Sequence, residues 1–168
     1  QGGKTDDDGQ GGVVHGAADT AMAAVHGGAV VPVLGKLAPG AVYVVDTVVH
    51  ADAHHLRIGG GAYWVEKDDL YVLRERMAAN PQEFNALLDA PEFKDHYGSL
   101  LGERNVRLPK EFQAAAESCP HILNKQFYYM AELPASHLLR EDLVDLVMAH
   151  FDAAAPLRAY LRAGLQAG

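Results

Sequence analysis

Four side chains within a six-residue stretch have the types and spacing that could support chemistry. His50, Asp52, His54 and His55 form the pattern H-x-D-x-H-H, directly after an apolar run. Imidazole and carboxylate groups are common protein ligands of zinc and iron. The pattern therefore raises the hypothesis of a metal-dependent hydrolase that holds Zn or Fe with these four residues.

Backbone geometry favours a different interpretation of the same stretch. In an extended chain His50, Asp52 and His54 face one side and His55 faces the other. Only a turn at residues 51–53 would bring all four together. A polar hairpin tip explains these residues with no metal, so we predict a hairpin tip without a cofactor and keep the zinc or iron site as the alternative.

Basic side chains in the second half of the chain form the other candidate site. Its cations are Arg104, Arg107, Lys110 and Lys125. Such groups beside irregular backbone bind phosphate or carboxylate. Tyr63 and Trp64, which follow the glycine run 59–61, are most simply core and sheet-face residues; the alternative is that they border a ligand pocket. We predict a ligand site for a small anion or a protein partner; the alternative is that solvent and Glu103, Glu111 and Glu117 neutralise these cations.

Composition narrows the function classes. The 168 residues carry a formal charge of -8. A general nucleic-acid binder normally carries a basic stripe, and an anionic membrane repels an acidic surface, so we expect neither partner. No stretch is long enough for a transmembrane helix, and no secretory signal pattern occurs.

Cysteine usage indicates the compartment. Cys119 is the one cysteine and has no partner for an internal disulfide, which is typical of a reducing, cytoplasmic environment. Placed among apolar neighbours before Pro120, it is expected to be a small buried residue. The chain opens with Gln1, which indicates a processed product or a fragment.

The strands must position the histidine cluster. Residues 41–49 (AVYVVDTVV) are β-branched and aromatic, which favours a strand. Residues 55–58 and 62–65 predict a second strand, and the glycines between them suggest a bulge or a close backbone approach. A further strand is expected at 126–133, and a short one at 105–108.

Helical periodicity begins after Val65. We expect a first helix capped by Asp68 or Asp69, and a second that Asn80 caps, with Pro81 and Glu83 following in favoured positions. Three more helical segments follow. They are a helix from Pro91 that Gly98 ends, a turn at 120–124, and a last helix that starts near Ser136 or Arg140, carries His150 on its apolar face and breaks at Pro156.

These elements predict one α+β domain over residues 13–168, an antiparallel sheet covered by amphipathic helices. Residues 1–12 are rich in Gly and Asp and are expected to be a disordered tail. Within 13–40 the pattern is weak; it suggests a short helix near 17–25 and a strand near 29–34.

Several motifs occur in an order that resembles a known family. They are GGGAYWVEKDDLYVLRERMAANPQEFNALLDAPEFKDHYG from residue 59, LPKEF from 108, CPHILNKQF from 119 and AAAPLRAYL from 153. Over about residues 42–161 the chain resembles a conserved hypothetical family catalogued only as a domain of unknown function. The resemblance implies an α+β fold with an antiparallel sheet and flanking helices, but no activity.

Two further points follow from the resemblance. Lys110 and Lys125 align with recurrent basic positions of that family. Upstream of the sheet, members usually carry a basic segment of the kind R-D-x-R-F-S-x-D-K-x-P-Y-K, which this sequence lacks, and its first 40 residues do not match.

Overall fold

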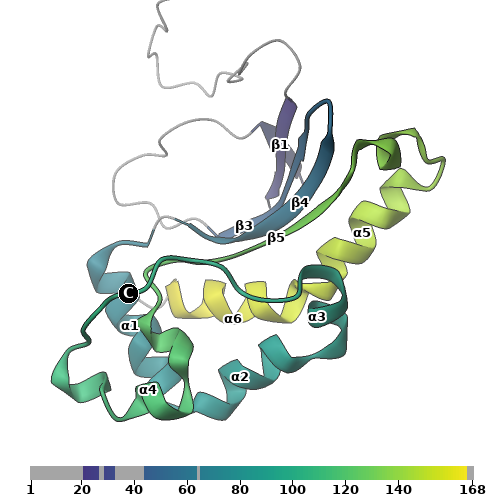
Figure 1. Cartoon of the computed structure of the whole chain (residues 1–168). Helices are drawn as coiled ribbons and strands as arrows, with labels where there is room; N and C mark the ends of the chain where they lie inside the picture. The colour runs from purple at the N-terminus through teal and green to yellow at the C-terminus, as the bar shows by residue number, and fades with distance from the viewer. Residues whose placement is uncertain (1–20, 27–28, 33–43, 64, 166–168) are drawn as a thin grey trace, which may run out of the picture.

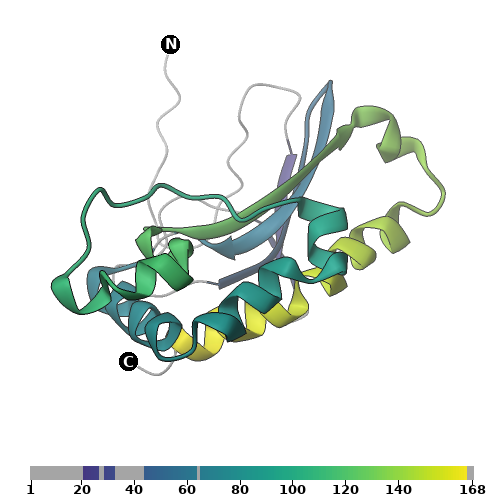
Figure 2. The same cartoon turned by 60° about the horizontal axis from the view of Figure 1, so that its bottom comes forward.

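One sheet, with helices packed on one of its faces, forms the body of the protein (Figures 1 and 2). The structure is a computed structural model that describes residues 21–26, 29–32, 44–63 and 65–165. The predicted tail and Trp64 lie outside these residues. The expected α+β class, with an antiparallel sheet covered by helices, is confirmed.

The sheet has five strands in the order β2-β1-β3-β4-β5, and every neighbouring pair is antiparallel. The strands are β1 (Ala21–His26), β2 (Ala29–Pro32), β3 (Val44–Ala51), β4 (His55–Ala62) and β5 (Phe127–Pro134). β3 and β4 form the predicted hairpin. The pairing shifts between Val45 and Val48, so the expected irregularity beside the glycines lies on β3.

The weak pattern before residue 40 predicts the secondary structure only in part. Residues 21–25 belong to strand β1, not to a helix, whereas the predicted strand near 29–34 contains β2. In β1 the small apolar residues pair with β3 over five positions. Tertiary pairing therefore overrides the weak local preference of these residues.

Most of the helices lie where the sequence predicts them. They are α1 (Lys67–Ala79), α2 (Pro81–Asp89), α3 (Pro91–Tyr97), α4 (Ala115–Ser118), α5 (Leu143–Ala153) and α6 (Ala155–Leu165), with short 3₁₀ turns η1 (Lys110–Phe112), η2 (Pro120–Leu123) and η3 (Ala135–Leu139). The Asn80 side chain accepts from the backbone N–H of Glu83 at 3.3 Å, as its cap pattern predicts. The first helix instead begins after Glu66, so the expected Asp68 or Asp69 cap is wrong.

Two other expectations concern the second half of the chain. The last helix does break near Pro156, because α5 ends at Ala153 and α6 restarts at Ala155. Residues 105–108 form no strand; the pairing nearby is a single bridge between Arg104 and Asn124.

The core lies between the sheet and α1, α2, α3 and α6. Directly paired residues of antiparallel strands share a face, so Ala62, Phe127 and Tyr129 point to the helices. Phe84 of α2 packs there, with ring centroids 6.3 Å from Phe127 and 5.2 Å from Tyr160 of α6. Burial of each such ring stabilises the fold by about 1.5 to 3 kcal/mol.

The opposite face of the sheet carries the polar residues. His50 of β3 pairs with Arg57 of β4, and Arg57 pairs with Glu132 of β5. These three residues therefore form a row across the sheet beside the β3–β4 turn.

Candidate functional site

Asp52 organises the turn between β3 and β4. Its carboxylate accepts the backbone N–H groups of His54 and His55, each at 2.8 Å, and the Arg57 guanidinium at 2.7 Å. The N–H of His54, the guanidinium of Arg57 and the N–H of His55 hold the pKa of Asp52 well below its usual value of 3.8. Asp52 therefore closes the turn as an Asx-type acceptor.

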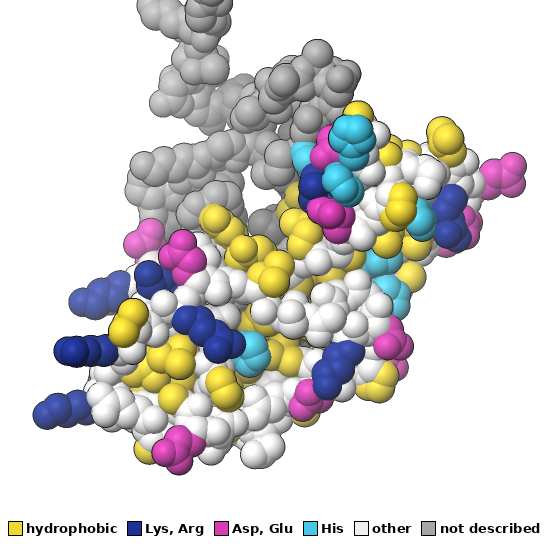
Figure 3. All heavy atoms as spheres, in the orientation of Figure 1, with side chains coloured by type: hydrophobic (Ala, Val, Ile, Leu, Met, Phe, Trp, Pro, Cys, Tyr) yellow, Lys and Arg dark blue, Asp and Glu magenta, His cyan; other side chains and the backbone are white. Residues whose placement is uncertain are grey.

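Arg57 occupies the centre of the hairpin cluster. Besides Asp52 it donates to Glu132 at 2.7 Å, and its guanidinium lies 3.3 Å from Nδ1 of His50 and 3.3 Å from Nδ1 of His55. Figure 3 shows histidine, basic and acidic side chains gathered at this end of the sheet. The positively charged guanidinium of Arg57 thus lies among the side chains predicted as metal ligands.

This arrangement bears on the zinc or iron hypothesis. The structure brings His50, Asp52 and His55 together around Arg57, and His54 contributes its backbone N–H to Asp52. In the described part of the chain, no three or more His, Cys, Asp or Glu residues are arranged to hold a metal ion. The polar hairpin tip is the interpretation that this geometry supports.

The second candidate site is built on two segments that run antiparallel beside the outer edge of β5. Leu101 and Tyr128 bond through their backbones at 2.7 and 3.4 Å, and Lys125 N donates to Glu103 O at 2.8 Å. Further on, Asn105 N donates to Leu123 O at 2.8 Å. We call residues 101–110 and 122–128 the basic ribbon, because it holds Arg104, Arg107 and Lys110 on one segment and Lys125 on the other.

The charges of this ribbon are largely uncompensated. Arg104, Arg107 and Lys110, which starts η1, are exposed, and among residues 48–63 and 65–165 none of them has a carboxylate within 4.0 Å. Only Lys125 pairs as expected, 3.6 Å from Glu103. Glu111 instead accepts the hydroxyl of Tyr71 at 3.2 Å. Ion pairing with neighbouring acids therefore does not account for most of the cluster.

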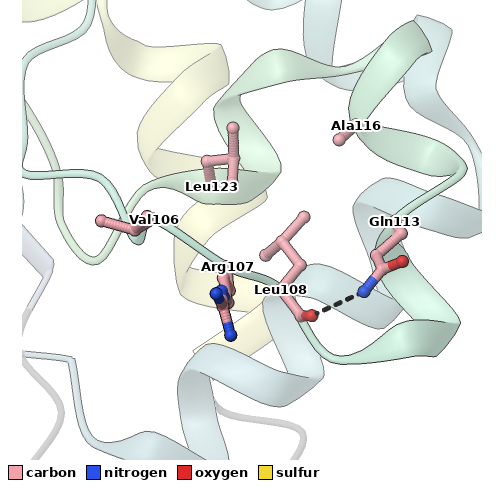
Figure 4. Close-up of a pocket in the computed structure, with 6 residues that line it drawn as sticks. All are labelled: Val106, Arg107, Leu108, Gln113, Ala116 and Leu123. Atoms are coloured by element: carbon pink, nitrogen blue, oxygen red, sulfur yellow. Dashed lines mark hydrogen bonds between the residues drawn. The ribbon is translucent and has the colours of Figure 1, made fainter.

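A shallow hollow of about 250 Å³ lies against the ribbon (Figure 4). Its lining is mainly apolar and consists of Val106, Leu108, Ala116 and Leu123, with Arg107 and Gln113. The Gln113 amide donates to Leu108 O at 3.2 Å, which leaves its carbonyl oxygen as an acceptor. The hollow thus combines apolar walls with one guanidinium.

The side chain of Arg74 on α1 is hydrogen-bonded to the backbone of the ribbon. Its side chain is only 6% exposed, and it donates from Nε to Ile122 O at 2.8 Å and from Nη2 to Asn124 O at 3.3 Å. These carbonyls lie at the end of η2, where a cation is favourable. Burial lowers the pKa of Arg74.

The pKa of His121, near the start of η2, depends on the charge of the ribbon. Burial lowers the pKa of its imidazole, and the charge of Arg104 lowers it further, while the Asn124 side chain acts in the opposite direction. The ring also packs 6.1 Å from that of Phe84. Burial and the charge of Arg104 therefore both disfavour the protonated form of His121.

Of the remaining predicted residues, Tyr63 contacts the ribbon. It follows β4, is 44% exposed, and its ring lies tilted against that of Tyr128 with the centroids 5.1 Å apart. Trp64 lies outside the described residues. Cys119 is buried, and burial raises the pKa of its thiol. His150 is buried on α5, as its place on the apolar face predicts.

Sequence reasoning did not predict the contacts of Arg57, Arg74 and His121 described above. Arg57 and His121 are sequence neighbours of the candidate residues His55 and Cys119, in HHLR and CPHIL. Arg74 carried no local signal, because its partners are 48 and 50 residues away.

Comparison with known proteins places the chain in a family. The model of the family described as "Conserved hypothetical protein (DUF2461)" matches residues 33–160, beginning before the expected residue 42. No curated protein and no solved structure matches the chain. Within the described residues, none of the helices has the length and apolar character that crossing a membrane requires.

Proposed function

We propose that this chain, which belongs to the DUF2461 family of conserved hypothetical proteins, binds a small anionic ligand at its basic ribbon. The observation that carries the proposal is a group of exposed cations, Arg104, Arg107 and Lys110, that have no carboxylate partner among the described residues, in a chain of net charge -8. Elsewhere, cations such as Arg57, Arg76 and Arg140 pair with acids at 2.6 to 3.0 Å. Within the part of the chain that the structure describes, three cations close together in sequence without a carboxylate within 4.0 Å favour an external anion.

The surroundings strengthen the attraction of this site for an anion. The nearly buried guanidinium of Arg74 adds positive charge beneath the ribbon, and its described partners are backbone carbonyls. Charges near low-dielectric protein interact more strongly than charges in water. The backbone bonds between residues 101–105 and 123–128 hold the cations on a preformed frame.

The hollow suggests what else the ligand carries. Its apolar lining from Val106, Leu108, Ala116 and Leu123 lies beside the Arg107 guanidinium. Small-molecule sites commonly combine apolar walls with one or two charged groups. We therefore expect an anion that bears a small apolar group to bind more tightly than the bare anion.

Thermal unfolding with inorganic phosphate tests the charged half of the site. A ligand at 100 times its Kd stabilises a protein by about 2.7 kcal/mol, which raises the Tm of a chain of this size by roughly 5 to 10 °C. Arg107→Glu should abolish this shift, and so should Lys110→Glu combined with Lys125→Glu. Lys94→Glu, at an exposed lysine of α3 that pairs with Asp89, is the charge-matched control and should keep it.

Phenyl phosphate tests the apolar half, because its head group matches that of phosphate. It should stabilise the parent protein at lower concentration than phosphate, and Ala116→Asp in the hollow should remove that advantage. If neither anion stabilises the parent, or if Lys94→Glu removes the shift as fully as Arg107→Glu, the proposal fails. The expected protein partner stays a prediction that these titrations do not test.

A further inference from the structure

Two histidines that lie outside the basic ribbon meet where α3 packs against α5. The ring centroids of His96 and His150 are 4.7 Å apart, and the ring planes are nearly perpendicular. The Tyr97 hydroxyl donates to the backbone carbonyl of His150 at 2.7 Å, so the contact between the two helices is fixed beside the pair.

Each ring is oriented by its own helix. Nδ1 of His96 lies 2.7 Å from Glu92 O, and Nδ1 of His150 lies 2.8 Å from Leu146 O. A carbonyl oxygen only accepts, so both Nδ1 atoms carry the hydrogen and both Nε2 atoms carry the lone pair. Metal-bound histidines are commonly held in this way, with the other ring nitrogen donating to a backbone carbonyl.

The Nε2 atoms are available for a ligand. Neither has a hydrogen-bond partner among the residues that the structure describes, although the His150 side chain is only 6% exposed. Figure 3 shows histidine side chains reaching the surface where α3 adjoins α5. A nearly buried imidazole with a fixed orientation and a lone pair on Nε2 is suited to bind a metal ion.

The ring separation agrees with a shared metal. For Zn–N bonds of about 2.0 to 2.1 Å, two rings on one ion have centroids roughly 4.5 to 5.3 Å apart for right-angle to tetrahedral coordination. The observed 4.7 Å lies in this interval. We propose that His96 and His150 bind one zinc ion through their Nε2 atoms, with water as the remaining ligands.

Such a site has two protein ligands, and so differs from the three- and four-ligand centres typical of catalytic and structural zinc. Zinc there would join α3 to α5 and stabilise the folded state by mass action. The site is independent of the anion proposed for the basic ribbon, and either proposal can fail alone.

Calorimetric titration of the full chain with Zn²⁺ alone tests the site. The parent should bind zinc, and His96→Ala, at a partly exposed position, should bind it at least about tenfold more weakly. His150→Gln should show the same loss. Control variants His54→Ala and His137→Ala change histidines outside the pair and should keep the parent affinity.

A thermal readout separates the site from a change in folding. Zinc should raise the Tm of the parent, of His54→Ala and of His137→Ala, but not that of His96→Ala. The proposal is overturned if the parent binds no zinc, if His96→Ala binds zinc as the parent does, or if binding is lost in His54→Ala instead.

Discussion

Arg74 and Ile122 are 48 residues apart in sequence, yet the guanidinium Nε of Arg74 donates to the Ile122 carbonyl at 2.8 Å. A second bond from the same side chain reaches Asn124 O. This contact ties α1 to the ribbon that carries Arg104, Arg107 and Lys125. The position of the candidate site therefore depends on a residue that would not itself touch the ligand.

Replacing Arg74 should destabilise the fold. Hydrogen bonds from a charged group contribute about 1.5 to 3 kcal/mol, and Arg74→Met removes two of them and leaves two carbonyls without this donor. We expect a loss of about 3 kcal/mol in the free energy of unfolding, measured by urea denaturation. Arg74→Lys should restore only part of it, since an ammonium lacks the forked geometry.

The matched control is Arg104→Met, which removes an exposed guanidinium from the ribbon. It should change the free energy of unfolding by less than about 0.5 kcal/mol. Equal losses in Arg74→Met and Arg104→Met would contradict the anchoring role of Arg74.

Acid should weaken the hairpin tip through Asp52. The folded-state pKa of Asp52 lies below its usual value of 3.8, so its stabilising contribution is complete above that value and is lost as the pH falls further. Asp52→Asn should therefore have a lower Tm than the parent at pH 6, and the difference should shrink between about pH 4 and pH 2. Thermal unfolding as a function of pH measures this, and Asp95→Asn, at an exposed residue of α3, is the control. A difference that stays constant over this range would count against the Asp52 network.

Gly61 should tolerate substitution much less than Gly98. Both have positive φ, +106° and +77°, but a Cβ on Gly61 would lie 2.3 Å from Phe127 O, whereas a Cβ on Gly98 would meet nothing within 4 Å. Gly98→Ala should cost about 1 kcal/mol for the backbone conformation alone, and Gly61→Ala at least about 3 kcal/mol. Urea denaturation compares the two, and similar losses would mean that the close approach of β4 and β5 is not limiting.

Local patterns in the sequence were sufficient for much of the fold. Asn80, Pro81 and Glu83 lie within one turn of each other, so their cap could be predicted without knowledge of any distant contact. The β3–β4 hairpin was likewise predictable from the β-branched run before the polar turn and the short segments around the glycines after it. By contrast, β1 consists of small residues whose strand state depends on pairing with β3.

The candidate sites were predictable only in composition. The residue types around His50 gave a metal hypothesis, but the partner that decides the arrangement, Arg57, also bonds to Glu132, 75 residues further on. In the basic cluster, sequence proximity suggested pairing with Glu111, yet that carboxylate bonds to Tyr71. Both outcomes depend on contacts between residues that are far apart in sequence. A local sequence pattern does not contain this information.

Arg104 links the titration of His121 to the anion site. The charge of Arg104 lowers the pKa of His121, in addition to the larger effect of burial. Arg104→Ala should therefore raise the pKa of His121 toward the usual value of about 6.5, as measured by NMR titration of its ring protons. Lys94→Ala, which removes a cation from α3, should leave it unchanged.

Sulfate makes the same measurement a test of binding, because it does not titrate in this range. An anion held by Arg104 partly cancels the charge that His121 senses, so saturating sulfate should raise the pKa of His121 in the parent. The shift should be much smaller in Arg104→Ala, in which the anion has lost one of its cations. An equal rise in both proteins would show that sulfate acts by general screening and not by occupying the basic ribbon.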